Sequence, residues 1–267
     1  MEAGTLEAVQ RMSRDIRAAA ATMTDQEARF LVDAYYIMQE DRKRSSNQTR
    51  SADESGEPNM VLSWYAAQSA TVEDQIKGAL DKYTQGHRMG EWMRAVYGIG
   101  PVLSAGLLAH IDIRRAPTVG HIWRFAGLDP TMVWEKGQRR PFNAKLKTLC
   151  WKIGQSFMKF HAREECYYGH LYVQRKAYEV ERNERGVHAE YAAERAGKVG
   201  KSTEAYKAYS GGKLPPGQID ARARRYAVKQ FLSDLHGAWY RAEFGTEPPK
   251  PYPIAILGHA HERVAPH

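Results

Sequence analysis

One predicted helix carries a row of side chains that could bind a nucleotide. Tyr36, Gln39 and Arg42 recur every three residues, which places them along one stripe of a helix, and the stripe continues toward Asn47 and Gln48. An aromatic ring, an amide and a guanidinium group are side chains that stack on a base and bind its polar edge. The same residue types are also ordinary on the flank of a packed helix. The sequence alone leaves both interpretations open.

Two histidines near the end of the sequence, His259 and His261, could take part in acid–base chemistry. Imidazole titrates near neutral pH, so either ring could accept or donate a proton. Histidines at this spacing could also share a metal ion, but no cysteine or acidic cluster accompanies them. We therefore expect no metal site and no cofactor.

The segment around residues 92–109 predicts a site for a phosphate group. An amphipathic segment ends at Tyr97, Gly98 and Gly100 can supply the positive φ of a tight hairpin, and Pro101 suits the first turn of a following helix. In such a unit, backbone N–H groups of the hairpin and of the next helix point outward without partners and can bind a phosphate oxygen. The residues expected to supply this contact are Gly98, Ile99, Gly100 and Val102. A Gly-x-Gly turn between helices also occurs in proteins that bind nothing.

A basic stretch follows the predicted hairpin. No Asp or Glu occurs between Glu135 and Glu164, whereas Lys and Arg recur throughout. These cations are Lys136, Arg139, Arg140, Lys145, Lys147, Lys152, Lys159 and Arg163. The net charge of +8 favours an anionic partner, although a merely solvated basic face is the alternative. Because the stretch directly follows the hairpin, we expect a nucleic acid, with the first five of these cations as DNA contacts.

Several strings around the hairpin resemble a known family. They are Gly98-Ile99-Gly100-Pro101, Ala105-Gly106-Leu107-Leu108-Ala109, Phe125-Ala126-Gly127-Leu128-Asp129-Pro130 and Gly137. Together they resemble the helix-hairpin-helix back domain of insertion-sequence transposases, which pair an RNase H-like domain with a serine-bearing domain. The resemblance covers residues 92–160 and implies a DNA-binding helix-hairpin-helix unit. The nucleophilic serine expected just before Gly137 is absent and no RNase H-like sheet precedes the unit, so the resemblance implies DNA binding without transposition.

Two functions follow from this resemblance. The first is a helix-hairpin-helix protein of phage or mobile-element type that binds duplex DNA largely without sequence preference and acts in DNA processing or modification. The second is a phage transferase that attaches an amino acid or similar group to an activated thymine derivative in DNA. In that enzyme Tyr36, Gln39, Arg42, Asn47 and Gln48 would hold the flipped base or activated group, and the acid–base candidates would be Asp129, Glu135, His259 and His261. The basic charge also fits RNA.

The elements that position these residues are expected to be helices, and the fold all-α and multi-helical. Thr24 to Glu27 has the form of a capping box that opens a helix reaching about Lys43. Residues 45–59 are polar and predict a mobile loop, and residues 60–83 predict another helix. Beyond the hairpin, residues 118–126 predict a short helix closed by Gly127, and Asn143 suits the N-cap of a helix with buried Leu146, Leu149, Ile153, Phe157 and Phe160.

The second half of the sequence is expected to be more exposed. Residues 167–172 should interrupt or bend the preceding helix, residues 175–201 resemble a solvent-exposed charged arm, and residues 210–217 form a loop. A last helix over residues 220–244 would carry three arginines near its positive end, where a bound phosphate could offset them: Arg222, Arg224 and Arg225. The arm or this helix could form a homo-oligomer contact. The predicted regions are 1–84, 85–165 and 166–267.

The remaining features exclude several classes of protein. Cys150 and Cys166 form neither a disulfide framework nor a zinc pattern, so both should be reduced thiols. No apolar run approaches the roughly 20 residues that span a bilayer, and no signal peptide is apparent. We expect a cytoplasmic protein without a membrane partner, located in the host cell if it is phage-encoded.

Overall fold

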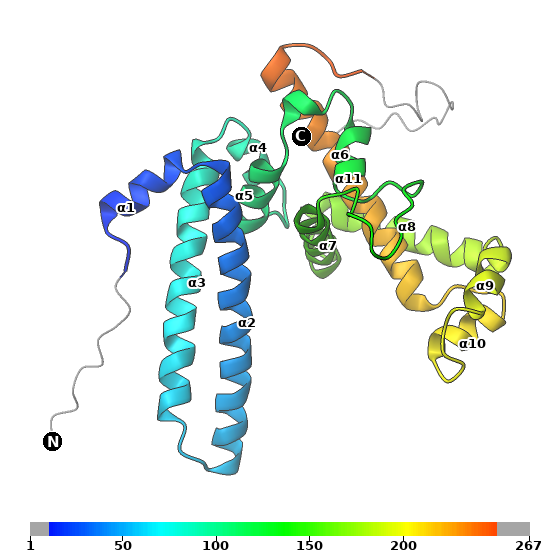
Figure 1. The fold of residues 1–267 in the computed structure, drawn as a ribbon, viewed down its shortest axis with the longest axis horizontal. Coiled ribbons are helices and arrows are strands. Elements are labelled where there is room, and N and C mark those ends of the chain that lie inside the picture. The colour runs from blue at the N-terminus through cyan, green and yellow to red at the C-terminus, as the bar shows by residue number, and fades with distance from the viewer. Residues whose placement is uncertain (1–10, 250–267) are drawn as a thin grey trace. The chain divides into compact units, whose positions relative to one another are not determined.

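The structure, a computed structural model, describes residues 11–249, and every regular element among them is a helix (Figure 1). The predicted all-α class is therefore confirmed. The helices form two compact units, which comprise Met1–Ala95 with Ile99–Asp112 and Val96–Gly98 with Ile113–His267. We call them unit 1 and unit 2. The predicted regions 1–84, 85–165 and 166–267 stay a prediction.

Unit 1 is built around two long helices that lie side by side, α2 (Asp25–Ser55) and α3 (Met60–Gly86) (Figure 1). They are preceded by α1 (Arg14–Ala19) and followed by α4 (Gly90–Ala95) and α5 (Pro101–His110), and α5 packs against both long helices. The capping box predicted at the start of α2 is confirmed, because the side chains and backbone N–H groups of Thr24 and Glu27 bond reciprocally. Local sequence therefore fixes where α2 begins.

The mobile loop predicted for residues 45–59 is wrong, because α2 continues as a helix to Ser55. Small side chains, among them Ser45 and Ala52, are buried along this part of the helix, and the Ser45 hydroxyl donates to the Asp41 carbonyl. Packing against α3 thus outweighs the weak helix propensity of the Ser, Asn and Thr residues. The helix ends only at Gly56, which adopts the left-handed conformation with φ of 69°.

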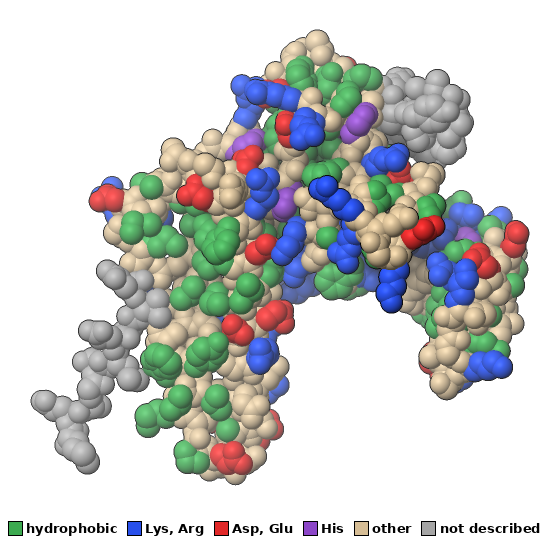
Figure 2. All heavy atoms as spheres, in the orientation of Figure 1, with side chains coloured by type: hydrophobic (Ala, Val, Ile, Leu, Met, Phe, Trp, Pro, Cys, Tyr) green, Lys and Arg blue, Asp and Glu red, His purple; other side chains and the backbone are tan. Residues whose placement is uncertain are grey.

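The α2–α3 pair leaves large apolar side chains uncovered. Figure 2 shows hydrophobic side chains along one face of this pair. The exposed residues on these two helices are Phe30, Ile37, Met60, Val61, Trp64 and Tyr65. No Lys or Arg lies between residues 51 and 76, so this surface is aromatic and aliphatic without being basic.

Unit 2 is organised around its longest helix, α11 (Pro216–Phe244), which contacts α6 (Val119–Phe125), α7 (Ala144–Lys159) and α8 (Tyr167–Glu184). Two shorter helices, α9 (Ala189–Ala196) and α10 (Glu204–Ser210), pack on each other. At the centre the rings of Phe157, Tyr168 and Phe231 touch one another, with centroids 5.0–5.6 Å apart. This aromatic core joins α7, α8 and α11.

Three expectations for the second half are corrected. Residues 167–172 do not interrupt a helix but open α8, because Tyr168 and Tyr172 are buried and donate to Asp234 and Asp220. The charged arm 175–201 is broken after Glu184 and is partly buried rather than solvent-exposed throughout. The helix predicted for 220–244 begins one turn earlier, at Pro216, which suits a first helical position.

Cys150 and Cys166 are free and buried, as expected for reduced thiols. Burial raises the pKa of the Cys150 thiol to about 12. Within residues 11–249, none of the helices combines the length and the apolar character that crossing a bilayer requires.

Candidate nucleic-acid interface

The turn between α4 and α5 contains one of the two glycines with positive φ that the sequence predicts. Gly98 has φ of 93°, as expected, whereas Gly100 has φ of −88° and ψ of 176°. The predicted positive φ of Gly100 is therefore wrong. Gly100 is the N-cap of α5, a position with extended backbone that needs no glycine, and Pro101 follows it at the first helical position as predicted.

The start of this turn is anchored within unit 2 by α7. The Ser156 hydroxyl donates to the Gly98 carbonyl at 2.5 Å, and a Cβ atom added to Gly98 would lie 3.3 Å from the Phe157 ring. The neighbouring Tyr97 ring packs edge-on against Phe160, with centroids 5.6 Å apart. Glycine at position 98 is therefore required both by its φ and by the close approach of α7.

The backbone of the turn, not its side chains, is what could contact a phosphate. The side chains of Ile99 and Val102 are buried, whereas Gly100 is exposed. Within the described part of the chain, the N–H groups of Gly100 and Val102 have no hydrogen-bond acceptor. Two of the predicted contact residues can thus act only through their backbone, and the N–H groups expected at a helix start are available.

The loop between α6 and α7 displays the basic stretch. It is closed at its base, where the Asn143 N–H donates to the Phe125 carbonyl at 2.8 Å and the Phe142 ring covers Gly127, whose φ is 65°. Between these points every residue from 133 to 141 is exposed, and Figure 2 shows Lys and Arg side chains over this part of unit 2. The loop cations are Lys136, Arg139 and Arg140.

Internal contacts give the loop a defined shape. The Trp134 indole N–H donates to the Gln138 carbonyl at 2.9 Å, and the Arg140 guanidinium lies 5.6 Å from the indole centroid. The carboxylate of Asp129 accepts from the N–H and hydroxyl of Thr131, and these bonds lower the pKa of Asp129. Asp129, an acid–base candidate, therefore shapes a turn.

Glu135, the second acidic candidate, is exposed and accepts from the Gln138 amide at 3.2 Å. This hydrogen bond, like those of Asp129, lies within the loop. Neither Asp129 nor Glu135 lines the hollow beside α8 that is described below.

The exposed face of α7 extends the basic surface. Its opposite face is buried as predicted through Leu146, Leu149, Ile153 and Phe157, whereas Phe160, also predicted to be buried, is the C-cap and only partly buried. The Asn143 side chain caps the helix by accepting from the Leu146 N–H. Lys145 and Lys147 are exposed in the first turn, and the Lys147 ammonium lies 4.2 Å from the Phe142 ring centroid. No carboxylate occurs anywhere in α7.

Trp151 is a surface residue of α7 that the sequence reasoning missed. Its side chain is 58% exposed, and it lies one turn beyond Lys147 on the outer face of the helix. The sequence could have indicated this exposure, because Trp151 lies four residues after Lys147 and outside the predicted buried stripe of α7. An exposed indole in a basic surface is typical of proteins that bind nucleic acid.

The arginines at the start of α11 serve the fold. Because α11 begins at Pro216, they lie in its second and third turns, away from its positive end. Arg222 binds Glu179 at 3.0 Å and Arg224 binds Asp220 at 2.7 Å. Carboxylates, rather than the predicted phosphate, therefore offset these two charges.

The nucleotide-binding row predicted on α2 is largely engaged with α3. Arg42 binds Glu73 at 2.5 Å, and the Gln39 amide donates both to the Tyr35 hydroxyl and to Glu73. Burial by itself raises the pKa of Glu73, but the bond and charge of Arg42 outweigh it and the pKa is lowered. Glu73 was missed because it lies 31 residues from Arg42 in the sequence.

The other members of that row do not join this cluster. Tyr36 packs edge-on against Tyr35, with centroids 5.3 Å apart, and burial raises its pKa. Asn47 accepts from the side chain of Arg50, and Gln48 is exposed. The structure therefore brings Gln39 and Arg42 together at Glu73 but does not gather the whole row. His259 and His261 lie outside the described residues.

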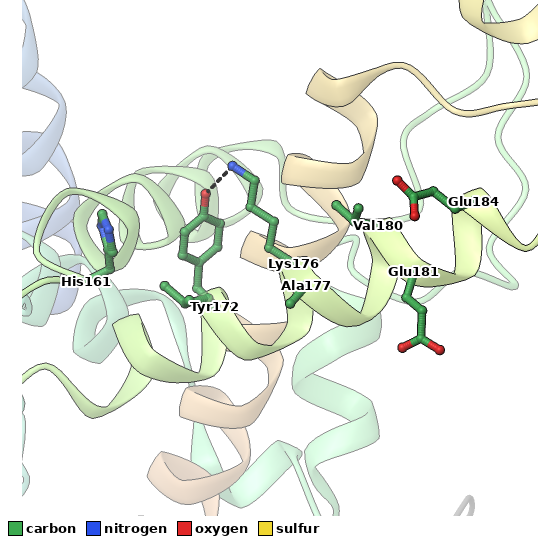
Figure 3. A pocket seen from close by; sticks show the side chains of 8 residues that line it. His161, Tyr172, Lys176, Ala177, Val180, Glu181 and Glu184 are labelled. Atoms are coloured by element: carbon green, nitrogen blue, oxygen red, sulfur yellow. Dashed lines mark hydrogen bonds between the residues drawn. The ribbon is translucent and has the colours of Figure 1, made fainter.

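Unit 2 has a hollow of about 530 Å³ beside α8, shown in Figure 3. Lys176 donates to the Tyr172 hydroxyl at 3.2 Å and pairs with Asp220 at 3.3 Å, so the polar groups at one end satisfy one another. Glu181 and Glu184 lie at the other end. Two carboxylates would repel a phosphate, and none of the predicted site residues lines this hollow.

A scan of the chain against models of known protein families finds no match, and searches of the curated proteins and of the solved structures find no significant match either. Among residues 11–249, no three His, Cys, Asp or Glu side chains are grouped so that they could hold a metal ion.

Proposed function

We propose that this protein binds duplex DNA through its phosphates, largely without sequence preference. The observation that carries the proposal is that the carboxylate-free stretch from Lys136 to Arg163 forms an exposed loop and one exposed helix face of unit 2. Each cation that contacts a phosphate releases condensed counterions, which is the main source of non-specific affinity for DNA. Contacts of this kind position a protein on the backbone but carry no sequence information.

Two cations of the loop differ from the arginines that pair within the fold. Arg42, Arg222 and Arg224 each bind a carboxylate that is at least partly buried. On the loop, Lys136 and Arg139 are exposed and have no partner among the residues the structure describes. A concentration of cations without matching carboxylates produces a positive potential that attracts a polyanion.

The turn between α4 and α5 is the second contact we propose. Its free N–H groups at Gly100 and Val102 precede and open a helix of ten residues, a combination that suits one phosphate oxygen. We interpret α4, the turn and α5 as a helix-hairpin-helix unit of the kind that the resemblance to insertion-sequence transposases implies. On this basis we place the protein in phage or mobile-element DNA processing or modification.

The test is binding to a short DNA duplex at several salt concentrations, with RNA duplex and single-stranded DNA in parallel. The triple variant Lys136→Gln, Arg139→Gln, Arg140→Gln removes up to three phosphate contacts, so the slope of log affinity against log salt should fall by about 2 to 3. A matched control removes three exposed lysines from the α9–α10 region by Lys198→Gln, Lys201→Gln and Lys207→Gln.

The two triple variants lower the net charge equally, so the control separates a local contact from a general charge effect. We expect the control to bind like the wild type. Equal losses for both variants would refute a defined contact surface. Weak, salt-insensitive binding of the wild type to all three nucleic acids would refute the function itself, and a preference for RNA duplex would change the substrate.

A further inference from the structure

Trp151 is the most exposed of the tryptophans. The side chain is 58% exposed, compared with 41% for Trp64 and for Trp134. Its neighbours on the buried face of α7, Cys150 and Ile153, are almost completely inaccessible, so the helix has a packed face that does not include the indole. The indole therefore lies on the surface of α7, outside the packed core.

The surroundings of Trp151 are basic and polar. Residues three and four positions away share its part of the helix surface, and these include Lys147, Thr148 and Gln155. Lys152 follows it directly, and α7 contains no carboxylate. A ligand that fits this surface carries negative charge and presents a flat face to the indole. A nucleotide has both properties.

Continuous duplex DNA does not offer such a face. Within B-DNA each base is covered on both sides by its neighbours, and exposing one requires unfavourable unstacking. A base in a single-stranded gap, flap or end is already accessible, and stacking on an aromatic side chain tolerates any base. The helix face would therefore contact phosphates of any DNA, whereas its indole discriminates in favour of unpaired nucleotides.

We propose that Trp151 is a stacking platform for an unpaired base, and that the preferred ligand is duplex DNA interrupted by single-stranded nucleotides. The proposal rests on the proposed DNA-binding function and specifies its substrate. The flanking lysines hold the backbone on both sides of the base, and their charge strengthens the stack through the polarised ring. Trp134 is less suited to this role, because Arg140 lies over its ring and its N–H is bound to Gln138.

The experiment compares the full chain on a continuous duplex and on the same duplex with a short gap of unpaired thymidines. The wild type should prefer the gapped DNA. Trp151→Leu, which keeps apolar bulk but removes the ring, should lower gapped-DNA affinity at least about fivefold and leave continuous-duplex affinity unchanged. Trp151→Phe should retain most of the preference. Trp64→Leu is the matched control, since Trp64 is an exposed tryptophan of unit 1 without basic neighbours on its helix face.

The outcomes separate this proposal from the function on which it rests. If the wild type binds both DNAs with steep salt dependence but Trp151→Leu does not change their ratio, the stacking platform is refuted and phosphate binding stands. Equal loss on both DNAs refutes it as well, because Trp151 would then act only in general binding or packing. If the wild type binds neither DNA, both proposals fail. Quenching of indole fluorescence by the gapped DNA, present in Trp64→Leu and diminished in Trp151→Leu, would support direct contact.

Discussion

Replacement of Glu179 by glutamine should destabilise unit 2 strongly. The Glu179 side chain is completely buried, and its carboxylate pairs with Arg175 at 2.5 Å and Arg222 at 3.0 Å, with His188 at 3.4 Å. These partners come from α8, from α11 and from the residue that precedes α9. Glutamine keeps the shape but not the charge, so two guanidinium groups would lose the anion that they share.

The magnitude follows from the burial of the partners. Removing one member of a buried ion pair costs about 3 to 5 kcal/mol when the remaining charge has no access to water. The side chains of Arg175 and Arg222 are 28% and 31% exposed and can recover part of their hydration. We therefore expect the lower end, about 3 kcal/mol, which corresponds to a decrease of the urea midpoint by at least about 1 M.

The assay must report on unit 2 alone. Of the six tryptophans, Trp64 and Trp92 belong to unit 1, so a Trp64→Phe, Trp92→Phe background confines the fluorescence signal to unit 2. Glu181→Gln is the matched control, because Glu181 lies on the same helix, is exposed and, among residues 11–249, pairs only with Arg185, four residues away. Its loss should cost no more than about 0.5 kcal/mol.

A double-mutant cycle completes the test. Arg222→Gln should destabilise the wild type more than it destabilises Glu179→Gln, with a coupling of at least about 1 kcal/mol. The reasoning is refuted if Glu179→Gln and Glu181→Gln have similar stability, or if the cycle shows no coupling. Either result would mean that the buried carboxylate does not join α8 to α11.

Three further predictions concern the turn, the thiols and the pH dependence. Gly98→Ala should lower the urea midpoint, at a cost of about 1 to 2 kcal/mol, because φ is 93° and the added Cβ atom would lie 3.3 Å from the Phe157 ring. Gly100→Ala, with open space around it, should change stability by less than about 0.5 kcal/mol and keep DNA affinity. Cys150 and Cys166 should react with Ellman's reagent at pH 8 only after urea unfolding, because burial raises both pKa values; rapid labelling of native protein would contradict this. Burial by itself raises the pKa of the Glu179 carboxyl, but Arg222 and Arg175 outweigh burial and the pKa is lowered. The ionised Glu179 should therefore stabilise the fold fully above the unfolded-state pKa of about 4.3, and this stabilisation should decline as the pH falls through the lower pKa of the folded state. The stability difference between wild type and Glu179→Gln should accordingly shrink below pH 4, and a constant difference would contradict it.

Features that depend on neighbouring residues were predicted well. The capping box at Thr24, the N-cap at Asn143 and the helix start at Pro101 are confirmed, because each depends on a hydrogen bond or backbone angle fixed within four residues. The end of α2 was predicted wrongly, because nothing in the sequence near Ser45 indicates that α3 packs against this part of the helix. Pairing with a distant helix decides whether a polar segment continues as a helix, and that information is not local.

The contrast between local and distant partners also applies to the candidate site residues. Gln39 and Arg42 have the right chemistry for a nucleotide, but that chemistry also fits Glu73, and a carboxylate 31 residues away cannot be assigned as partner from sequence alone. The exposure of Lys136 and Arg139 was predictable because their segment contains no apolar periodicity and no acid. The same polar residue types pair with one another inside a fold or bind a ligand. Only the structure, which shows the partner, distinguishes the two cases.

This distinction also bears on the net charge of +8. Where unit 2 needs cations for its own packing, it supplies carboxylates to match: Glu179 pairs with two arginines, and Asp220 pairs with Lys176 and Arg224. Among the described residues, Lys136 and Arg139 of the loop have no such carboxylate, although Glu135 directly precedes Lys136. Repulsion among exposed cations of the basic stretch opposes the folded state. A bound polyanion would offset that repulsion, and the decrease in salt slope caused by the loop variant reports how many phosphates the loop contacts.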